Sequence, residues 1–470
     1  MKVDFDSLNN IFFVGIKGSG VCSLACFLNL KGYYVEGVDV PDKFHTDEVL
    51  SRNKISYYEN IYEFSLKELN RSFDLIVYSS AYDKNNLQIL LEAKELNIPI
   101  LSYPEVLGEL SKKYYSIGIA GSHGKTTTTA FLGILFNKLG LNPNVIVGSS
   151  VKDFGDNSSI SGISNIFIVE TCEYKKHFLH FSPNMLILTN VEYEHVDFFK
   201  NYEVLEDAFL QYINNLKENG ILIINSDDNN LLKIKRKINR KDINIFSFGS
   251  RDLSDSDFQI SNIVVKNEYF CFSFLGLYNI ELKTVLFHNV LNFSASLLAL
   301  NLFLESNGKS IFDFEEAVKR VAKNYSGIKR RAEVIKEENG VIYMDDYAHH
   351  PREIRDTLFG IKNFYKNKRI ILNFMPHTFT RTKEFFDDFV EVLSVADVLI
   401  LHNIYLSNRE NFNSDELSVK LFLDIKKINR NTYFFKNIKD SVEFIKNLLI
   451  SGDLFITMGA GNNFILHDFL

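Results

Sequence analysis

The stretch Gly118-Ile119-Ala120-Gly121-Ser122-His123-Gly124-Lys125-Thr126-Thr127-Thr128-Thr129 decides how the middle of this chain folds. It follows an extended apolar segment and precedes residues 130–139, whose apolar side chains are spaced as in a helix. A glycine-rich turn that enters a helix presents free backbone N–H groups and a partial positive charge, which together hold phosphate. Lys125 can reach the β- and γ-phosphates, and the Thr126 hydroxyl can ligate Mg²⁺. An ordinary strand–turn–helix junction is the alternative, and phosphate binding is the interpretation that we favour.

Alternating strand and helix patterns extend from this loop in both directions and predict an α/β protein with parallel sheets. The chain of 470 residues is long enough for about three domains. We expect them at 1–108, 109–325 and 326–470, with the charged segment after Pro104 as the first boundary. Residues 241–285 are richer in short alternating strands and favour a small antiparallel extension. The expected strands are 11–14, 34–38, 75–79, 166–169, 185–189, 221–224, 341–344, 370–374, 398–401, 432–435 and 454–458.

The composition limits the possible classes of function. A net charge of −7 without a basic block argues against nucleic acid as a partner. The longest run without charged residues, Thr284–Leu304, contains a histidine and asparagines, so we expect no membrane span. The four cysteines lack the spacing of a zinc site, and the N-terminal residues include no secretory apolar core. We therefore expect a cytoplasmic protein in reducing surroundings.

A second glycine cluster, Gly15-Ile16-Lys17-Gly18-Ser19-Gly20, lies between an expected strand and an expected helix. Doubly wound folds hold a pyrophosphate at such a place. The spacing differs from the dinucleotide fingerprint G-x-G-x-x-G, and Asp39 closes the next strand, where an acidic group often binds sugar hydroxyls. From these residues alone, NAD binding, binding of a UDP-type nucleotide and simple tight packing all stay open.

A carboxylate and an imidazole follow the phosphate loop at the ends of expected strands. Glu170 ends the strand at 166–169, and His195 follows the strand at 185–189. Because the carboxyl ends of parallel strands meet at one edge, both should approach Thr126. Mg²⁺ prefers a few hard ligands together with phosphate oxygens and water, so these side chains could hold two such ions. The alternative for His195 alone is a surface loop histidine.

Further side chains could contact the nucleotide. Asn289 and Asn292, at the head of an apolar helix, suit the edge of adenine, although asparagine there can equally cap the helix. Arg331 ends a run of three basic residues. An arginine can clamp a phosphoryl group during transfer, whereas the alternative is a solvated surface run. Asp346 ends an expected strand, where a carboxylate can bind ribose or metal-bound water.

Histidines and an arginine of the C-terminal part could bind a small carboxylate. His349 and its neighbour His350 precede a proline, which is an unusual arrangement. His377 and Arg381 lie at the end of another expected strand and could fix a carboxylate group. Arg381 could equally be a surface residue of the helix that begins there.

Taken together, these motifs resemble the Mur ligase family, whose members make peptidoglycan precursors by ATP-dependent amide formation. The matching stretches cover nearly the whole chain in the family's order: Gly121–Thr129, Glu170 with Thr189–His195, His288–Asn292, Arg331, Asp346–Pro351 and Gly459–Gly461. Within the family, Gly15–Gly20, Asp345–Ile354 and Pro376–Asp388 are similar to the branch that joins L-alanine to UDP-N-acetylmuramate. Glu170–Phe178 resembles the version of Gram-positive-type members.

The resemblance implies a Rossmann-like N-terminal domain for the UDP-sugar and a central P-loop ATPase-like domain with a mostly parallel sheet. A Rossmann-like C-terminal domain would bind the amino acid. ATP is then a substrate, two Mg²⁺ ions assist, and the protein is a monomer or a homodimer. The lactyl carboxylate would attack the γ-phosphate to give an acyl phosphate, which the amine of L-alanine converts to the amide.

Carried over residue by residue, the resemblance assigns a set of side chains to each ligand. The UDP-sugar would be bound by Gly15, Gly18, Gly20, Asp39, Ser80, His123 and Asn190. ATP would be bound by Gly121, Ser122, His123, Gly124, Lys125, Thr126, Thr127, Asn289, Asn292, Arg331 and Asp346. The amino acid would be bound by His349, His377 and Arg381, and the metal ions by Thr126, Glu170 and His195. The catalytic set would be Lys125, Glu170, His195, Arg331 and His349.

Some positions depart from the family's common pattern. Glu194 stands where many members carry aspartate before the histidine. Residues 207–209 offer no lysine for the carbamylation that several sister ligases use, as expected for the alanine-adding branch. Thr378 replaces an arginine of some members, which leaves more of the carboxylate recognition to Arg381. Asn462 follows the last glycine, where an aspartate is common.

Three other functions remain to be weighed. A recycling ligase that joins a whole tripeptide to the same UDP-sugar would share every ATP-site residue. An NAD-dependent oxidoreductase built on Gly15–Gly20 would leave Lys125, Glu170 and His195 without a role. A nucleotide-binding regulator without activity would not need the complete set of these side chains.

Overall fold

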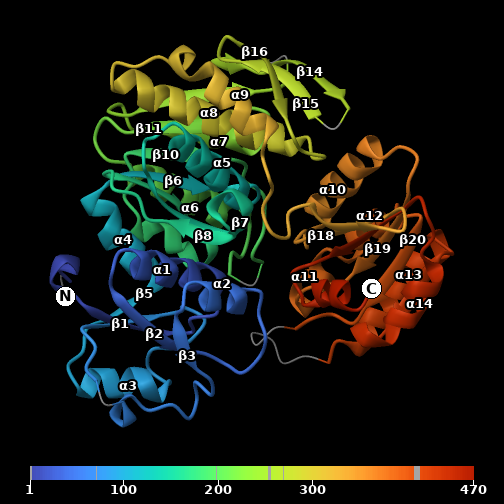
Figure 1. Cartoon of the computed structure of the whole chain (residues 1–470), viewed down its shortest axis with the longest axis horizontal. Helices are drawn as coiled ribbons and strands as arrows, with labels where there is room; N and C mark the ends of the chain where they lie inside the picture. Colours follow the sequence, from blue (N-terminus) through green and yellow to red (C-terminus); the bar gives the residue numbers. More distant parts are fainter. Residues whose placement is uncertain (1–2, 70, 197, 252–255, 268, 407–412) are drawn as a thin grey trace.

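A computed structural model of the protein describes all residues except 1–2, 70, 197, 252–255, 268 and 407–412. The described residues form four β-sheets, and helices pack against the three larger ones (Figure 1). Nearly all strands of the three larger sheets pair in parallel. The predicted α/β class is therefore confirmed.

The N-terminal sheet is wholly parallel, with the order β3-β2-β1-β4-β5. Its central strand β1 (Asn10–Val14) is buried on both faces, because Ile11 and Phe13 enter one apolar cluster and Phe12 and Val14 enter another. The other strands are β2 (Tyr34–Val38), β3 (Ser56–Tyr58), β4 (Leu75–Tyr78) and β5 (Ile100–Ser102), and the helices are α1 (Ser19–Leu30), α2 (Thr46–Arg52) and α3 (Gln88–Glu95).

The middle sheet has eight strands in the order β13-β12-β11-β10-β6-β9-β7-β8, of which only the β7–β8 pair is antiparallel. Strand β6 (Tyr115–Ala120) lies near its centre and leads into the phosphate loop and helix α5 (Lys125–Lys138). The other strands are β7 (Asn144–Val151), β8 (Asn157–Ile160), β9 (Ile166–Glu170), β10 (Met185–Leu188), β11 (Ile221–Asn225), β12 (Asn244–Gly249) and β13 (Phe258–Gln259). The other helices are η4 (Tyr174–His180), α6 (Tyr202–Asn214), α7 (Asn229–Lys237), α8 (His288–Ser306) and α9 (Glu315–Lys323).

The predicted antiparallel extension is smaller than expected. Strands β14 (Ser261–Lys266), β15 (Tyr269–Phe274) and β16 (Leu277–Leu282) form it. Strand β12 instead extends the large parallel sheet beside β11, because helix α7 provides the crossover that a parallel pair needs.

The C-terminal sheet has the order β17-β18-β22-β19-β20-β21 and is parallel except for its edge strand β17. The figure shows this part as a separate lobe beside the other two (Figure 1). Its strands are β17 (Glu333–Glu338), β18 (Val341–Asp346), β19 (Arg369–Phe374), β20 (Val398–His402), β21 (Thr432–Phe435) and β22 (Asp453–Met458). Its helices are α10 (Pro351–Phe364), α11 (Phe379–Glu384), α12 (Phe386–Leu393), α13 (Asp415–Ile428) and α14 (Val442–Leu448).

Helix α4 (Tyr103–Lys113) connects the N-terminal sheet to the middle sheet. Ser102 and Glu105 form a capping box, and Pro104 occupies the first turn, where a missing N–H costs nothing. The charged segment is thus an amphipathic helix, and a division after residue 108 would cut it. The predicted domain limits themselves stay a prediction.

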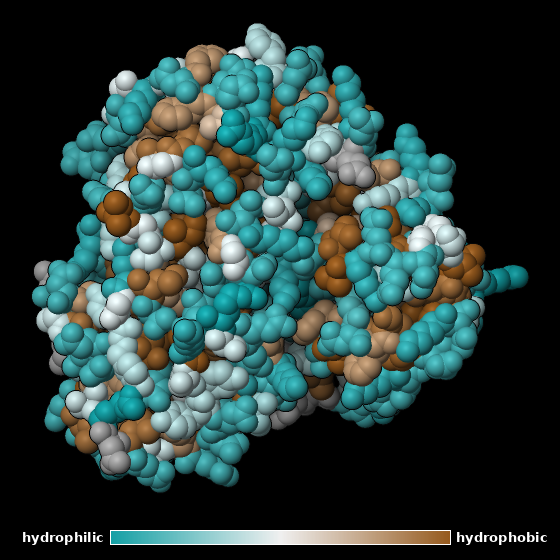
Figure 2. Space-filling model, in the orientation of Figure 1, coloured by the Kyte–Doolittle hydropathy of each residue, from teal (hydrophilic) through white to brown (hydrophobic). Residues whose placement is uncertain are grey.

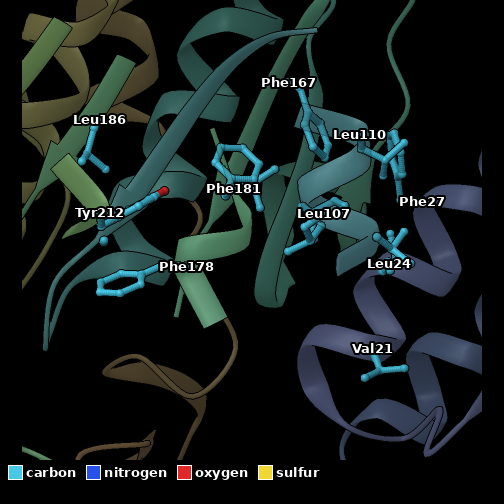
Figure 3. Close-up of a cluster of buried hydrophobic side chains, with 14 of the residues drawn as sticks. Val21, Leu24, Phe27, Leu107, Leu110, Phe167, Phe178, Phe181, Leu186 and Tyr212 are labelled. Carbon is cyan, nitrogen blue, oxygen red and sulfur yellow. The ribbon is translucent and has the colours of Figure 1, made fainter. Parts of the chain in front are cut away.

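The N-terminal and middle parts share one apolar core. Leu24 and Phe27 of α1, Leu107 and Leu110 of α4 and Phe167 of β9 are all buried in the same cluster (Figure 3). The rings of Phe27 and Phe167 lie 5.6 Å apart between centroids. Burial of such large side chains joins these two parts firmly.

The surface of the molecule is largely polar in the view of Figure 2, where hydrophilic side chains cover most of this face. Within the described ranges, no helix combines the length and the apolar character that crossing a lipid bilayer requires.

Candidate active site

The phosphate loop joins β6 to α5 through two glycines with left-handed backbone angles. Gly121 has a φ of +139° and Gly124 a φ of +80°. A Cβ atom at Gly124 would lie 2.6 Å from Oδ1 of Asn292, so a larger residue would meet a packed helix as well as backbone strain. No side chain caps the start of α5, which leaves N–H groups of its first turn available for phosphate.

Lys125 points back into the loop. Its Nζ donates to the carbonyl oxygen of Gly121 and to that of Ser122, the latter at 2.9 Å, and forms an ion pair with Glu173 at 3.0 Å. Burial alone would lower the pKa of Lys125, but the carboxylates of Glu173, Glu194 and Glu170 raise it above its ordinary value. The amine therefore stays charged beside the loop.

Thr126 and Glu170 are in direct contact, as the sequence predicted for a metal site. The Thr126 hydroxyl donates to Oε2 of Glu170 at 2.9 Å, and the backbone N–H of Gly148 donates to the same oxygen at 2.9 Å. These hard oxygen donors beside a phosphate loop fit the coordination that Mg²⁺ prefers.

His195 reaches the loop through Glu173, a residue that the sequence analysis did not single out. Nε2 of His195 lies 3.3 Å from Oε1 of Glu173, whose other oxygen pairs with Lys125. Burial would raise the pKa of Glu173, but Lys125 and His195 hold it below its ordinary value. The ligand atoms of Glu173, Glu194 and His195 all lie within 4.8 Å of one another, which is compact enough for a cation. The only sequence signal for Glu173 was its place three residues after Glu170.

Two predicted adenine-binding residues border the phosphate loop at the head of α8. Oδ1 of Asn292 accepts a hydrogen bond from the Thr128 hydroxyl at 3.3 Å, and Nδ2 of Asn292 donates to Oδ1 of Asn289 at 3.3 Å. The alternative that an asparagine caps this helix is wrong, because Phe287 holds the cap position and no side chain completes it. Contact with adenine stays a prediction.

Arg331 and Asp346 lie where β18 ends. The carboxylate of Asp346 accepts hydrogen bonds from the backbone N–H groups of Ala332 at 2.6 Å and Ala348 at 2.8 Å. Burial raises the pKa of Asp346 to about 6, although Arg331 acts in the opposite direction. Arg330 is bound elsewhere, to Asp345 at 3.0 Å, so Arg331 is the arginine of this pair that can face a nucleotide.

The three predicted amino-acid-binding residues meet around Glu194 of the middle part. Nη2 of Arg381 lies 3.3 Å and Nε2 of His349 lies 3.7 Å from Oε1 of Glu194. Nη1 of Arg381 is 3.3 Å from Nδ1 of His377. Burial lowers the pKa of His349 to about 4, helped by the Arg381 cation, so its ring is neutral at pH 7. The structure thus brings together side chains that are far apart in sequence.

His123 links the phosphate loop to the C-terminal lobe. Its Nδ1 lies 3.0 Å from Oε1 of Glu353 on α10, and its Nε2 lies 3.0 Å from Oε2 of Glu192. Its backbone N–H donates to Oδ1 of Asn190 at 2.8 Å. Asn190 therefore shapes the loop, and the roles of His123 and Asn190 in binding the UDP-sugar stay predictions. Glu192 and Glu353 were not predicted, because their partners come from distant segments.

The first glycine cluster forms the turn between β1 and α1. Gly15 has a φ of +79°, and a Cβ atom there would lie 2.7 Å from the ring of Tyr82. Asp39 accepts hydrogen bonds from the backbone N–H of Lys17 at 2.6 Å and from the Tyr82 hydroxyl at 3.2 Å. The predicted sugar ligand Asp39 thus fixes this turn from within the protein. A role for it in binding the UDP-sugar stays a prediction, as it does for Gly18, Gly20 and Ser80.

Comparison with known proteins is consistent with this architecture. The Mur ligase family, catalytic domain, matches residues 10–115. The Mur ligase middle domain matches residues 119–300, and the Mur ligase, glutamate ligase domain, matches residues 330–461.

Relatives and solved structures agree with these domain matches. The chain is 90% identical to the UDP-N-acetylmuramate--L-alanine ligase of Borreliella afzelii (strain PKo) over the full length of both. It is 37% identical to the enzyme of that name from Treponema pallidum (strain Nichols), covering 98% of this chain and 95% of the relative. The solved UDP-N-acetylmuramate-alanine ligase MurC of Thermotoga maritima superposes with a TM-score of 0.78 at 22% identity, covering 98% of this chain and 97% of that one. This chain belongs to the Mur ligase family.

Proposed function

We propose that this protein joins L-alanine to the lactyl carboxylate of UDP-N-acetylmuramate in an ATP-dependent reaction that yields ADP and phosphate. One observation carries the proposal: two residues adjacent in sequence, Glu194 and His195, connect the ATP site to the side chains that are predicted to bind the amino acid. His195 contacts Glu173 and, through it, Lys125, whereas Glu194 contacts Arg381 and His349. An acyl phosphate formed at the loop would therefore lie next to the incoming amino acid. The names of the full-length relatives support the same choice of substrates.

The first step would form an acyl phosphate from the carboxylate and the γ-phosphate of ATP. Lys125 and Arg331 would hold the transferring phosphoryl group between two anions that otherwise repel each other. Thr126 and Glu170 would hold one Mg²⁺ ion, and His195 with its neighbouring carboxylates a second. Bound Mg²⁺ would supply further positive charge at the phosphate oxygens. Such a transfer needs positioning and electrostatic stabilisation more than a covalent side chain.

The second step would form the amide from the acyl phosphate. Arg381 would bind the carboxylate of L-alanine, because Glu194 and His377 hold its guanidinium where the C-terminal lobe meets the middle part. The free amine then displaces phosphate through a tetrahedral intermediate. The C-terminal lobe supplies these side chains, so the reaction needs the lobes together.

Phosphate release tests the choice of amino acid. The enzyme is given MgATP and UDP-N-acetylmuramate with either L-alanine or the tripeptide L-alanyl-γ-D-glutamyl-meso-diaminopimelate. We expect release to depend on free L-alanine. Stimulation by the tripeptide alone would identify the recycling ligase, and NAD binding without ATP turnover would identify an oxidoreductase.

A further inference from the structure

The segment that follows β9 carries two consecutive lysines in an unfavourable backbone conformation. Lys175 has a φ of 51° and Lys176 a φ of 58°, both in the left-handed region. Residues other than glycine adopt this region at a cost, because Cβ approaches the backbone. Such strain tends to occur where a function maintains it. The segment is anchored at one end by Glu173, which is buried beside Lys125 and His195.

The ammonium group of Lys175 lies between the ATP site and the N-terminal sheet. Its Nζ donates to the carbonyl oxygen of Ser80 at 3.2 Å, just beyond the end of β4. The same Nζ lies 5.6 Å from the centre of the Tyr174 ring, and that ring lies 4.8 Å from the ring of His195. Lys175 thus links Ser80, beside the N-terminal sheet, to the paired rings of Tyr174 and His195.

The first glycine cluster has no cation of its own to offer a ligand. The Lys17 amine donates to the carbonyl oxygens of Val40 and Asp42, each at 3.0 Å, and its side chain is only 2% exposed. No side chain caps α1, so N–H groups at its start are available for an anion but lack a full positive charge beside them.

Lys175 is well suited to supply that charge. Its side chain is exposed, and among the ion pairs of the described residues none involves it. A single neutral carbonyl group is a weak partner for an ammonium ion. A phosphate oxygen would form a stronger, charge-assisted hydrogen bond with the same amine.

We propose that Lys175 binds the diphosphate of the nucleotide sugar, so that a residue of the ATP-binding part holds a ligand of the N-terminal sheet. This inference rests on the proposed function and names a binding residue for its UDP-sugar. It also gives a physical reason for the strained turn, which directs the amine across the junction toward Ser80.

Calorimetric titration of the full-length protein with UDP-N-acetylmuramate and, separately, with UDP tests this role. Lys175→Met removes the charge, and Lys175→Arg restores it. Lys176→Met is the matched control, because Lys176 shares the backbone conformation. We expect Lys175→Met to weaken the binding of both ligands about tenfold. Lys175→Arg and Lys176→Met should each change the affinity by less than about threefold. The unfolding temperature of each variant should match that of the wild-type protein.

Three results would contradict the inference in different ways. Unchanged affinity of Lys175→Met for both ligands would exclude the lysine while leaving the proposed function intact. Weaker binding of UDP-N-acetylmuramate but not of UDP would assign the lysine to the sugar's carboxylate and exclude the diphosphate. Failure of the wild-type protein to bind UDP-N-acetylmuramate would contradict the proposed function and this inference together.

Discussion

Gly15–Gly20 and Gly121–Gly124 both connect the carboxyl end of a parallel strand to a helix; Lys17 lies within the first loop and Lys125 directly follows the second. In the first loop, Lys17 turns away from the glycines, and its buried amine donates to two backbone carbonyl groups and pairs with Asp47 at 3.5 Å. In the second loop, Lys125 folds back over the glycines and pairs with Glu173. The first lysine is held inside the N-terminal part, whereas the second lies at the phosphate loop itself.

Neighbouring carboxylates account for this difference. Asp39, at the end of the adjacent strand, accepts the backbone N–H of Lys17 and fixes the loop so that the lysine amine faces the chain after β2. Glu173 lies beyond the strand next to the second loop and holds the amine of Lys125 itself. A glycine-rich loop therefore sets where backbone N–H groups point, and a distant carboxylate sets where the lysine points.

Replacing Lys125 should have the largest effect on activity. Lys125→Ala should lower phosphate release by about 1000-fold or more, because the transferred phosphoryl group loses its nearest fixed cation. Binding of UDP-N-acetylmuramate should stay normal. Lys138→Ala, an exposed lysine on the same helix, is the control and should keep full activity. Near-normal turnover of Lys125→Ala would show that the phosphate-loop assignment is wrong.

A methyl group at Gly124 should distort the second loop. Gly124→Ala should lower kcat/KM about 100-fold, because the new Cβ would meet Asn292 at 2.6 Å and displace Lys125. Gly140→Ala is the matched control, since Gly140 has a similar φ of +75° but nothing within 4 Å of a Cβ atom. The control should lose only about 1 kcal/mol of stability and no activity. Equal losses of activity in both variants would point to backbone strain alone.

Replacing Lys17 should affect stability instead of chemistry. Lys17→Met leaves the buried carbonyl group of Val40 without its donor and removes the ion pair with Asp47, which should cost about 2–3 kcal/mol. Thermal unfolding monitored by circular dichroism measures this loss. Lys67→Met, at an exposed position, should unfold at the wild-type temperature. If Lys17→Met were as stable as the wild type, the contrast between the two lysines would not hold.

Histidines around the second loop should make stability depend on pH. Burial lowers the pKa of His350 to about 4. As the pH falls, this histidine is therefore protonated at a lower pH in the folded protein than in the unfolded chain. The contribution of neutral His350 to the free energy of unfolding is complete above pH 6.5 and is lost as the pH falls from 6.5 to about 4. Between pH 7 and 5 this loss amounts to about 2 kcal/mol.

The variant His350→Asn isolates this contribution, because asparagine can still cap α10 but does not titrate. Urea unfolding at pH 7 and at pH 5 should show a smaller loss of stability for the variant than for the wild type. The same loss in both proteins would mean that another group causes the pH dependence.

The strands and the phosphate loop could be predicted from sequence because their signals are local. Buried parallel strands such as Met185–Leu188 are continuously apolar, and the loop has its own spacing of glycines and lysine. Glu173 and Glu353 could not be predicted in this way. Each depends on a partner brought close by the fold, and their sequence neighbours do not reveal which carboxylates become buried.

Errors at the borders of elements have a similar cause. Residues 105–113 follow a proline and carry four charges, which favours a domain boundary, yet in α4 these charges lie on one polar face while the apolar side chains are buried. Strand β12 has the alternation of an antiparallel strand, but the preceding helix α7 makes its pairing parallel. In both cases, contacts with other parts of the fold determine the structure, and the local sequence pattern does not reveal them.

Oxygen transfer from the sugar nucleotide to phosphate tests the central claim most directly. The enzyme is incubated with MgATP, L-alanine and UDP-N-acetylmuramate that carries oxygen-18 in its lactyl carboxylate. If Lys125 and its neighbours promote phosphoryl transfer to that carboxylate, each released phosphate should contain one labelled oxygen. Unlabelled phosphate released together with the amide product would contradict the acyl-phosphate route and the role given to the second loop.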